Sequence, residues 1–372
     1  MIYLDNNATT QPTGSVVEAM LPYLTECYFN ASASTAAFTG ADKPRREAAT
    51  AMAKLLNAEE SDCFTFTSGA TESNNWVFSC FARGHKAQRV LVSALEHSSV
   101  AEPAAKLAHL GFDVVELPVD GQGVVLLDSL RDALQEDTTL VSIMAANNET
   151  GVLEPVSEIG RLIREHCPTA LFHTDATQAL GKIPVDLQGE WQNVDLLSFS
   201  AHKFHGPKGI GGLYIRSGLE LEPMLLGGGQ ENGLRSGTTN TPALAGLAAA
   251  ASDARDLPLP TIRGLRDIFE SLLLDAIPDA TIHSRKAPRL PNTSCFSLPG
   301  IHSEEMVGFL ASAGFIVATG AACSSGAIHT SITLRALGVP HEVAASSLRI
   351  SLSKFTKLQE ITDLVLHLKK IF

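Results

Sequence analysis

Short apolar segments alternate with longer amphipathic segments along most of this chain. From about residue 50 onward the apolar runs predict strands, and between them apolar residues recur every three or four positions, as in helices that cover a sheet. Such helices are expected at 98–110, 156–167 and 243–251. The predicted strands are 63–67, 89–93, 112–117, 139–145, 170–173, 195–200 and 210–216. This alternation predicts an α/β fold with a mostly parallel sheet of seven strands.

A second alternating region follows a stretch that breaks the pattern. Residues 253–260 contain two prolines and several charges, which indicates a domain boundary. Beyond it, helices are expected at 263–276, 303–313, 342–347 and 358–370, around short strands near 294–298, 315–317 and 348–353. We therefore expect a large domain at residues 15–255 and a smaller α+β domain formed by residues 1–14 and 256–372.

Composition narrows the functional class. A chain of 372 residues with 45% hydrophobic residues can bury a substantial core, and a formal charge of −12 argues against a nucleic-acid surface. The sequence has no apolar run long enough for a membrane span and no leader pattern, so a cytoplasmic location is expected. The six cysteines are scattered without a CxxC motif, which favours reduced thiols over disulfides and predicts no zinc or other metal site.

One lysine is placed for chemistry. Lys203 follows the predicted strand 195–200 and has Ser200, His202 and several glycines as neighbours. An ammonium beside apolar walls loses solvation, its pKa falls, and the free amine can form a Schiff base with an aldehyde such as pyridoxal phosphate. A lysine near a strand end is more often a solvated loop residue, so this interpretation depends on the other residues of the site.

A carboxylate that follows a neighbouring predicted strand supports the interpretation of Lys203 as a Schiff-base lysine. Asp175 follows the apolar strand 170–173 and can pair with the pyridinium nitrogen of that cofactor, while Gln178 can reach the phenolic oxygen of its ring. Taken alone, Asp175 is explained equally well as the N-cap of a helix formed by the residues that follow it. Both interpretations stay open from the sequence.

A turn rich in small residues provides the third feature of the predicted site, a place for a phosphate group. Ser68 and Thr71 flank a turn between the predicted strand 63–67 and a predicted helix. Unpaired backbone N–H groups at a helix start, together with hydroxyls, suit a phosphate. In open α/β sheets ligands bind at the carboxyl ends of strands, where Ser68, Asp175 and Lys203 all fall.

Eight motifs follow one another along the chain: Tyr3–Thr10, Thr67–Asn74, Glu96–His97, Asn147–Glu149, His173–Gln178, Ser198–Gly209, Arg235–Thr238 and Ser347–Arg349. With these motifs in this order, the chain resembles the cysteine desulfurases, pyridoxal-phosphate enzymes of the class V aminotransferase group, nearly from end to end. The resemblance implies fold type I of the pyridoxal-phosphate transferases, conversion of L-cysteine to L-alanine, and a homodimer.

The resemblance also implies roles for single residues. Lys203 would hold the cofactor as an internal aldimine, with Asp175 on the pyridine nitrogen, Gln178 on the ring oxygen and His97 stacked on the ring. Arg349 and Asn148 would bind the substrate carboxylate, a task suited to a guanidinium. The residues implied around the cofactor phosphate are Ala70, Thr71, Ser200 and His202, with Thr238 contributed by the other subunit of the dimer.

Cys323 distinguishes among class V chemistries. By residue type alone it is more often a buried packing cysteine, but it lies among Gly, Ser and Ala in a segment that resembles the NifS/IscS type and not the SufS type. In that family Lys203 would remove the Cα proton, and the Cys323 thiolate would attack the substrate sulfur to give a persulfide and L-alanine. His97 would shuttle protons.

The sequence departs from the family pattern at two places, and these departures limit which family properties carry over to this chain. Residues 30–38 lack the proline of the usual Asn-Pro-x-Ser segment and the histidine that commonly follows it, and the sequence stops soon after its last predicted helix. The sulfur acceptor, such as an iron–sulfur scaffold, is therefore open. The choice between cysteine and selenocysteine is open for another reason, since sulfur and selenium differ too little to be distinguished from the side chains. The alternatives are a class V aminotransferase or cyst(e)ine lyase that does not use Cys323, and a catalytically silent scaffold.

Overall fold

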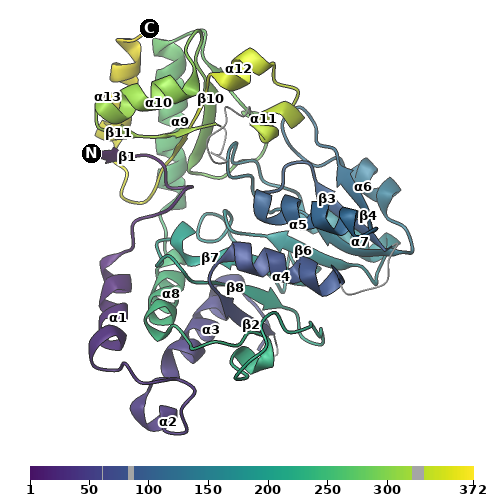
Figure 1. Cartoon of the computed structure of the whole chain (residues 1–372). Helices are drawn as coiled ribbons and strands as arrows, with labels where there is room; N and C mark the ends of the chain where they lie inside the picture. The colour runs from purple at the N-terminus through teal and green to yellow at the C-terminus, as the bar shows by residue number, and fades with distance from the viewer. Residues whose placement is uncertain (61, 83–87, 321–330) are drawn as a thin grey trace.

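The largest element of the computed structural model, which describes every residue except 61, 83–87 and 321–330, is a sheet of seven strands. The strands lie in the order β4-β3-β5-β6-β7-β8-β2 (Figure 1). The five from β4 to β7 run parallel, and β8 is antiparallel to both of its neighbours. The predicted α/β class and the mostly parallel seven-stranded sheet are confirmed. The strands are β2 (Cys63–Thr67), β3 (Arg89–Ser93), β4 (Asp113–Leu117), β5 (Thr138–Ser142), β6 (Leu171–Asp175), β7 (Leu196–Ser200) and β8 (Gly211–Ile215).

Helices cover both faces of this sheet. On β3, Val90 and Val92 pack with α4 and α5 on one face, while Leu91 joins the larger core on the other, as the alternation of side chains along a strand requires. The first face carries α4 (Ala70–Ala82) and α5 (Ser98–His109). The second carries α1 (Gly14–Thr25), α3 (Lys43–Leu56), α6 (Leu127–Ala133), α7 (Val156–His166) and α8 (Thr241–Ala254). Three short helices lie in connections: α2 (Ala36–Thr39), η1 (Ala201–Lys203) and η2 (Glu231–Gly233).

A second, four-stranded sheet in the order β12-β13-β10-β9 has its own apolar core and lies above the first in Figure 1. Its strands are β9 (Thr281–Ile282), β10 (Thr293–Ser297), β12 (Ala318–Thr319) and β13 (Ser347–Ser351). The helices of this region are α9 (Leu259–Ala276), α10 (Ser303–Ser312), α11 (Ile332–Ala336), α12 (His341–Ala345) and α13 (Leu358–Lys369). No helix in the described ranges is long and apolar enough to cross a bilayer.

The N-terminal segment joins the second sheet before it reaches the first. β1 (Ile2–Tyr3) pairs in parallel with β11 (Phe315–Ile316), and Leu4 is buried in the same core as the strands of the second sheet. Asp5 forms a bridge to Ser351 of β13, and the chain then descends to α1 (Figure 1). This path supports the proposed small domain of residues 1–14 and 256–372.

Three local predictions differ from the structure. The helix expected at 342–347 ends at Ala345, because Ser347 already pairs with Ser297 as the first residue of β13. The helix expected at 263–276 starts earlier, at Leu259, with Pro260 in its first turn, where a missing N–H breaks no helical bond. Helix α1 was not expected, because its exposed apolar residues obscure the polar face that marks an amphipathic helix.

Candidate active site

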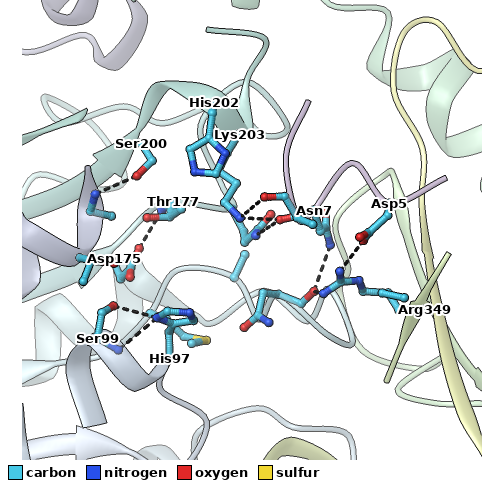
Figure 2. Close-up of a pocket in the computed structure, with 18 of the residues that line it drawn as sticks. Asp5, Asn7, His97, Ser99, Asp175, Thr177, Ser200, His202, Lys203 and Arg349 are labelled. Carbon is cyan, nitrogen blue, oxygen red and sulfur yellow. Dashed lines mark hydrogen bonds and ion pairs between the residues drawn. The ribbon is translucent and has the colours of Figure 1, made fainter. Parts of the chain in front are cut away.

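The carboxyl ends of β6 and β7 face a cavity of about 540 Å³ that the N-terminal segment and the second sheet close from the other side (Figure 2). That volume is within the range of small-molecule sites. With the exception of Thr238 and of Ser68, which lines an adjoining hollow, every predicted site residue in the described part of the chain lines the cavity. These residues are Ala70, Thr71, His97, Asn148, Asp175, Gln178, Ser200, His202, Lys203 and Arg349.

Lys203 reaches the centre of this cavity from the turn that follows β7. Its Nζ donates hydrogen bonds to the backbone oxygens of Asn7 at 2.6 Å and Ala8 at 2.9 Å. Burial, and secondly the positive charge of Arg349, lower the pKa of the Lys203 amine to about 8. About a tenth of the amine is therefore unprotonated at pH 7, far more than for an ordinary lysine, and the free amine is the form that acts as a nucleophile or base.

Asp175 ends β6 with its carboxylate on the cavity wall. One oxygen accepts a hydrogen bond from the backbone N–H of Thr177 at 2.9 Å, and the other accepts one from Asn74 Nδ2 at 2.8 Å. The residues after it form turns, so Asp175 caps a turn and not the helix that the alternative interpretation required. Gln178, in these turns, donates from Nε2 to the backbone oxygen of Asn7 at 3.0 Å.

A polar corner of the cavity lies at the N-terminus of α4. The backbone N–H of Ala70 donates to Ser200 Oγ at 2.7 Å, and Ser68 and Lys208 line the adjoining hollow. His202 lies on the same side, with Nδ1 3.2 Å from Thr9 Oγ1. Burial lowers the pKa of His202 to about 4, so the ring is neutral near pH 7. A helix N-terminus, hydroxyls and a lysine make this corner suitable for an anion such as a phosphate.

His97 caps α5 and faces the cavity from the side of β3. Its Nδ1 accepts the backbone N–H of Ser99 at 3.1 Å and lies 2.8 Å from Ser99 Oγ (Figure 2). Because Nδ1 already accepts the capping N–H, the neutral ring carries its proton on Nε2. Asn74 Nδ2 lies 2.9 Å from Ser99 Oγ, which extends this hydrogen-bond chain to Asp175.

Arg349 projects from β13 and provides the positive charge on the second-sheet side. Nη1 donates to the backbone oxygen of Asn148 at 2.9 Å, and Nη2 donates to Asp5 Oδ1 at 2.5 Å. The Nε atom is buried without a hydrogen-bond partner among the described residues. Because the guanidinium lines the cavity with donors to spare, it can bind a carboxylate there.

One of the two remaining predicted residues is not part of this arrangement. Thr238 is exposed and does not line the cavity of its own chain. Cys323 lies outside the described residues. Val317, Ala318 and Thr319, which precede that segment, do line the cavity, and the backbone N–H of Gly320 donates to the backbone oxygen of Ser347.

The sequence did not reveal Asp5, Asn7, Asn74 or Ser99 as residues of the site. Asp5 and Asn7 lie in the quoted motif Tyr3–Thr10, and Asn74 ends the motif Thr67–Asn74, so the motifs pointed to the right segments. No local pattern gave these side chains a role, because their partners lie up to several hundred residues away.

The chain is similar to a known enzyme family over most of its length. The class-V aminotransferase family matches residues 2–364. A cysteine desulfurase IscS of Methanosarcina thermophila is 40% identical over 366 residues, which cover 97% of this chain and 89% of that protein. A cysteine desulfurase 2 of Trichormus variabilis is 41% identical over 372 residues, covering 99% of this chain and 92% of that protein.

Solved structures show the same likeness. A NifS-like protein superposes with a TM-score of 0.91 at 37% identity, covering 100% of this chain and 98% of its own. SspA in complex with cysteine superposes with a TM-score of 0.84 at 30% identity, covering 96% of this chain and 100% of its own.

Proposed function

Because the chain belongs to the class-V aminotransferase family, among its cysteine desulfurases, we propose that it converts L-cysteine to L-alanine and transfers the sulfur to its own Cys323. The observation that supports this most directly is the placement of Lys203. Its amine, with a pKa of about 8, lies in one cavity with the Asp175 carboxylate and the Arg349 guanidinium. A free amine, a buried carboxylate and a cation for the substrate carboxylate are the groups that this reaction needs.

The cofactor proposed for the site is pyridoxal 5′-phosphate. The Ala70 corner offers a helix N-terminus and hydroxyls to its phosphate, and Asp175 and Gln178 lie where a ring bonded to Lys203 would meet a carboxylate and an amide. His97 would contact the face of the ring. When bound, the group provides an electron-withdrawing ring that stabilises negative charge at the substrate Cα.

The side chains of the cavity have separate roles in the proposed reaction. Arg349, oriented by the backbone oxygen of Asn148, binds the substrate carboxylate, and Lys203 takes the proton from Cα. The Cys323 thiolate attacks the substrate sulfur, so that an S–S bond forms while the bond between that sulfur and Cβ breaks. His97 delivers a proton to Cβ, the proton that Lys203 took returns to Cα, and the product leaves as L-alanine.

The cysteine variant Cys323→Ala tests this proposal. It should retain the visible absorbance of the cofactor, because Cys323 is not required to bind it, but its production of alanine from L-cysteine should fall by roughly a hundredfold or more. The matched control Cys27→Ala changes a partly exposed cysteine away from the cavity and should keep wild-type activity. Unchanged alanine and sulfide production by Cys323→Ala would contradict the persulfide mechanism and favour a lyase.

The assembly and the sulfur acceptor are proposed from the family. The protein would act as a cytoplasmic homodimer in which Thr238, exposed on its own chain, reaches the phosphate of the partner subunit's cofactor. The persulfide would pass to an iron–sulfur scaffold or another sulfur carrier. Mass determination in solution and transfer of labelled sulfur to a purified scaffold are the measurements that test these two statements.

A further inference from the structure

Asn7 connects the side of the cavity formed by the large sheet with the side formed by the second sheet. It is only 1% exposed and lies where the N-terminal segment passes between the large sheet and the second sheet (Figure 2). Its backbone oxygen accepts hydrogen bonds from Lys203 Nζ at 2.6 Å and Gln178 Nε2 at 3.0 Å. Both groups belong to the large-sheet side and are among those proposed to contact the cofactor.

The side chain of Asn7 makes a second set of contacts. Its Oδ1 accepts from Lys182 Nζ at 3.2 Å and from Asn292 Nδ2 at 3.1 Å. Its Nδ2 donates to the backbone oxygen of Asn148 at 3.1 Å and to Thr293 Oγ1 at 2.9 Å. A lysine can only donate and a backbone oxygen can only accept, so this amide has a single orientation.

Lys182 is the most unusual of these partners, because it is a buried lysine without a carboxylate. Its amine donates to Gln178 Oε1 at 2.5 Å as well as to Asn7. Among the ion pairs of the described residues, none includes Lys182 or Lys203. Burial, with Lys203 and Arg349 nearby, lowers the pKa of Lys182 well below its usual value.

We propose that Asn7 is a positioning residue of the proposed reaction, which holds the Lys203 amine and the Gln178 amide in place through uncharged acceptors and so keeps Lys203 available as a free base. The inference rests on the proposed function for its catalytic meaning. A carboxylate at this position could accept the same hydrogen bond from Lys182, but its negative charge would stabilise the ammonium forms of both lysines. An amide satisfies the buried donors without that effect.

The other charged groups around Lys203 are compatible with this positioning role of Asn7. Asp175 and Asp5 raise its pKa, but each carboxylate already accepts hydrogen bonds from other groups, including Arg349 on Asp5. Burial and Arg349 outweigh them and set the value near 8. Among the described residues, the titratable or charged groups that interact electrostatically with Lys203 are Asp5, Asp175, Lys182, His202 and Arg349.

The decisive variant is Asn7→Asp, which replaces one NH₂ by oxygen at nearly constant shape. The purified holoprotein should show the acid limb of its pH profile for alanine production shifted upward by about 1 to 2 pH units, as expected for a new negative charge near an amine. Activity near neutral pH should fall by roughly tenfold as a result. Asn30→Asp, an exposed position whose Oδ1 keeps its bond from the backbone of Ser32, is the matched control and should leave the profile unchanged.

A second readout separates this inference from the proposed function. Competitive acetylation of the full chain, freed of cofactor and followed across neutral to alkaline pH by mass spectrometry, reports the protonation of Lys203 even if the protein shows no desulfurase activity. Asn7→Asp should move the Lys203 midpoint upward. A midpoint equal to that of the wild type would overturn the inference, whether or not alanine is produced.

Asn7→Ala keeps the test decisive if the aspartate variant does not fold. It retains the backbone oxygen and adds no charge, so its acid limb should stay at the wild-type pH while kcat falls by about tenfold through lost positioning. A wild-type kcat in Asn7→Ala would contradict the positioning role. A shifted acid limb would contradict the argument from charge.

Discussion

Glu96, next in sequence to His97, is a half-buried residue whose carboxyl group points into the interior beside the cavity. Its Oε1 accepts hydrogen bonds from Ser93 Oγ at 2.6 Å and from the backbone N–H of Met144 at 2.7 Å, while Oε2 is buried without a hydrogen-bond partner among the described residues. Burial raises the pKa of Glu96 to about 8. The folded protein therefore holds a proton on this side chain at neutral pH, and Glu96 acts there as a neutral link between the turn before α5 and the end of β5.

This protonation predicts a specific pH dependence of stability. Since the folded pKa lies above the ordinary value of 4.5, the folded state binds the proton more tightly than the unfolded state between those two pH values. The contribution of Glu96 is therefore fully present below about pH 4.5 and is lost as pH rises to about 8. Glu96→Gln, which cannot ionise, should equal the wild type in acid and exceed it above pH 8 by a few kcal/mol, on the order expected from such a shift.

Urea unfolding at acid and alkaline pH measures this difference. The exposed residue Glu158 in the first turn of α7 provides a control, because its replacement by Gln should change the stability by no more than about 1 kcal/mol at either pH. A Glu96→Gln variant whose stability difference from the wild type is independent of pH would show that the buried carboxyl is ionised in the folded state.

At the scale of elements, strand β8 explains how the phosphate corner can form. It is the antiparallel strand inserted between β7 and β2, and its first residue, Gly211, lies against both neighbours. A Cβ on Gly211 would lie 2.2 Å from the backbone oxygen of Phe199 and 2.7 Å from Cα of Gly69. The turn between β2 and α4 can approach Ser200 only because β8 begins with a residue that has no side chain.

Gly211→Ala should therefore destabilise the protein strongly, by about 3 kcal/mol or more, because backbone on both sides must move. Chemical denaturation of the purified variant measures the loss. The control is Gly264→Ala in α9, where an added Cβ meets nothing within 4 Å and should stabilise the helix by about 0.5–1 kcal/mol. Equal stability of the two variants would contradict the argument.

At the scale of the whole molecule, the N-terminal helices expose an unusual amount of apolar surface. On α1, Val17, Leu21 and Leu24 are exposed at helical spacing, and Phe38 of α2 is 93% exposed. Apolar groups concentrated in this way are typical of an interface. The homodimer proposed above gives this surface an occupant, a second copy of the chain.

A charge at the centre of this surface should weaken the dimer. Leu24, 59% exposed, is replaced by Glu, and burial of that carboxylate against a second copy should favour dissociation at micromolar concentration. Sedimentation velocity over a dilution series measures the mass. Leu366→Glu, at a residue of similar exposure (52%) on α13, is the control that should leave the mass unchanged, and an equally stable Leu24→Glu dimer would place the interface elsewhere.

The sequence by itself determined the class of fold and the main polar groups of the site. Short, mostly apolar runs defined the seven strands of the large sheet to within a few residues, because strands covered on both faces carry few charged residues and turn residues mark their boundaries. Since ligands bind at the carboxyl ends of such strands, Asp175 and Lys203 could be placed on the same edge before any coordinates were known. Resemblance to a family then supplied Arg349 and Cys323.

Only the tertiary structure decided how those groups are supported. Asn7 and Lys203 are 196 positions apart, and the contact between Arg349 and Asp5 spans 344 positions. Contacts between residues so distant leave no periodic trace in the sequence, because each residue satisfies only its own local pattern. The pKa of Lys203, the orientation of the Asn7 amide and the neutral state of Glu96 depend on which charges and dipoles the folded chain brings together, and the fold alone fixes these.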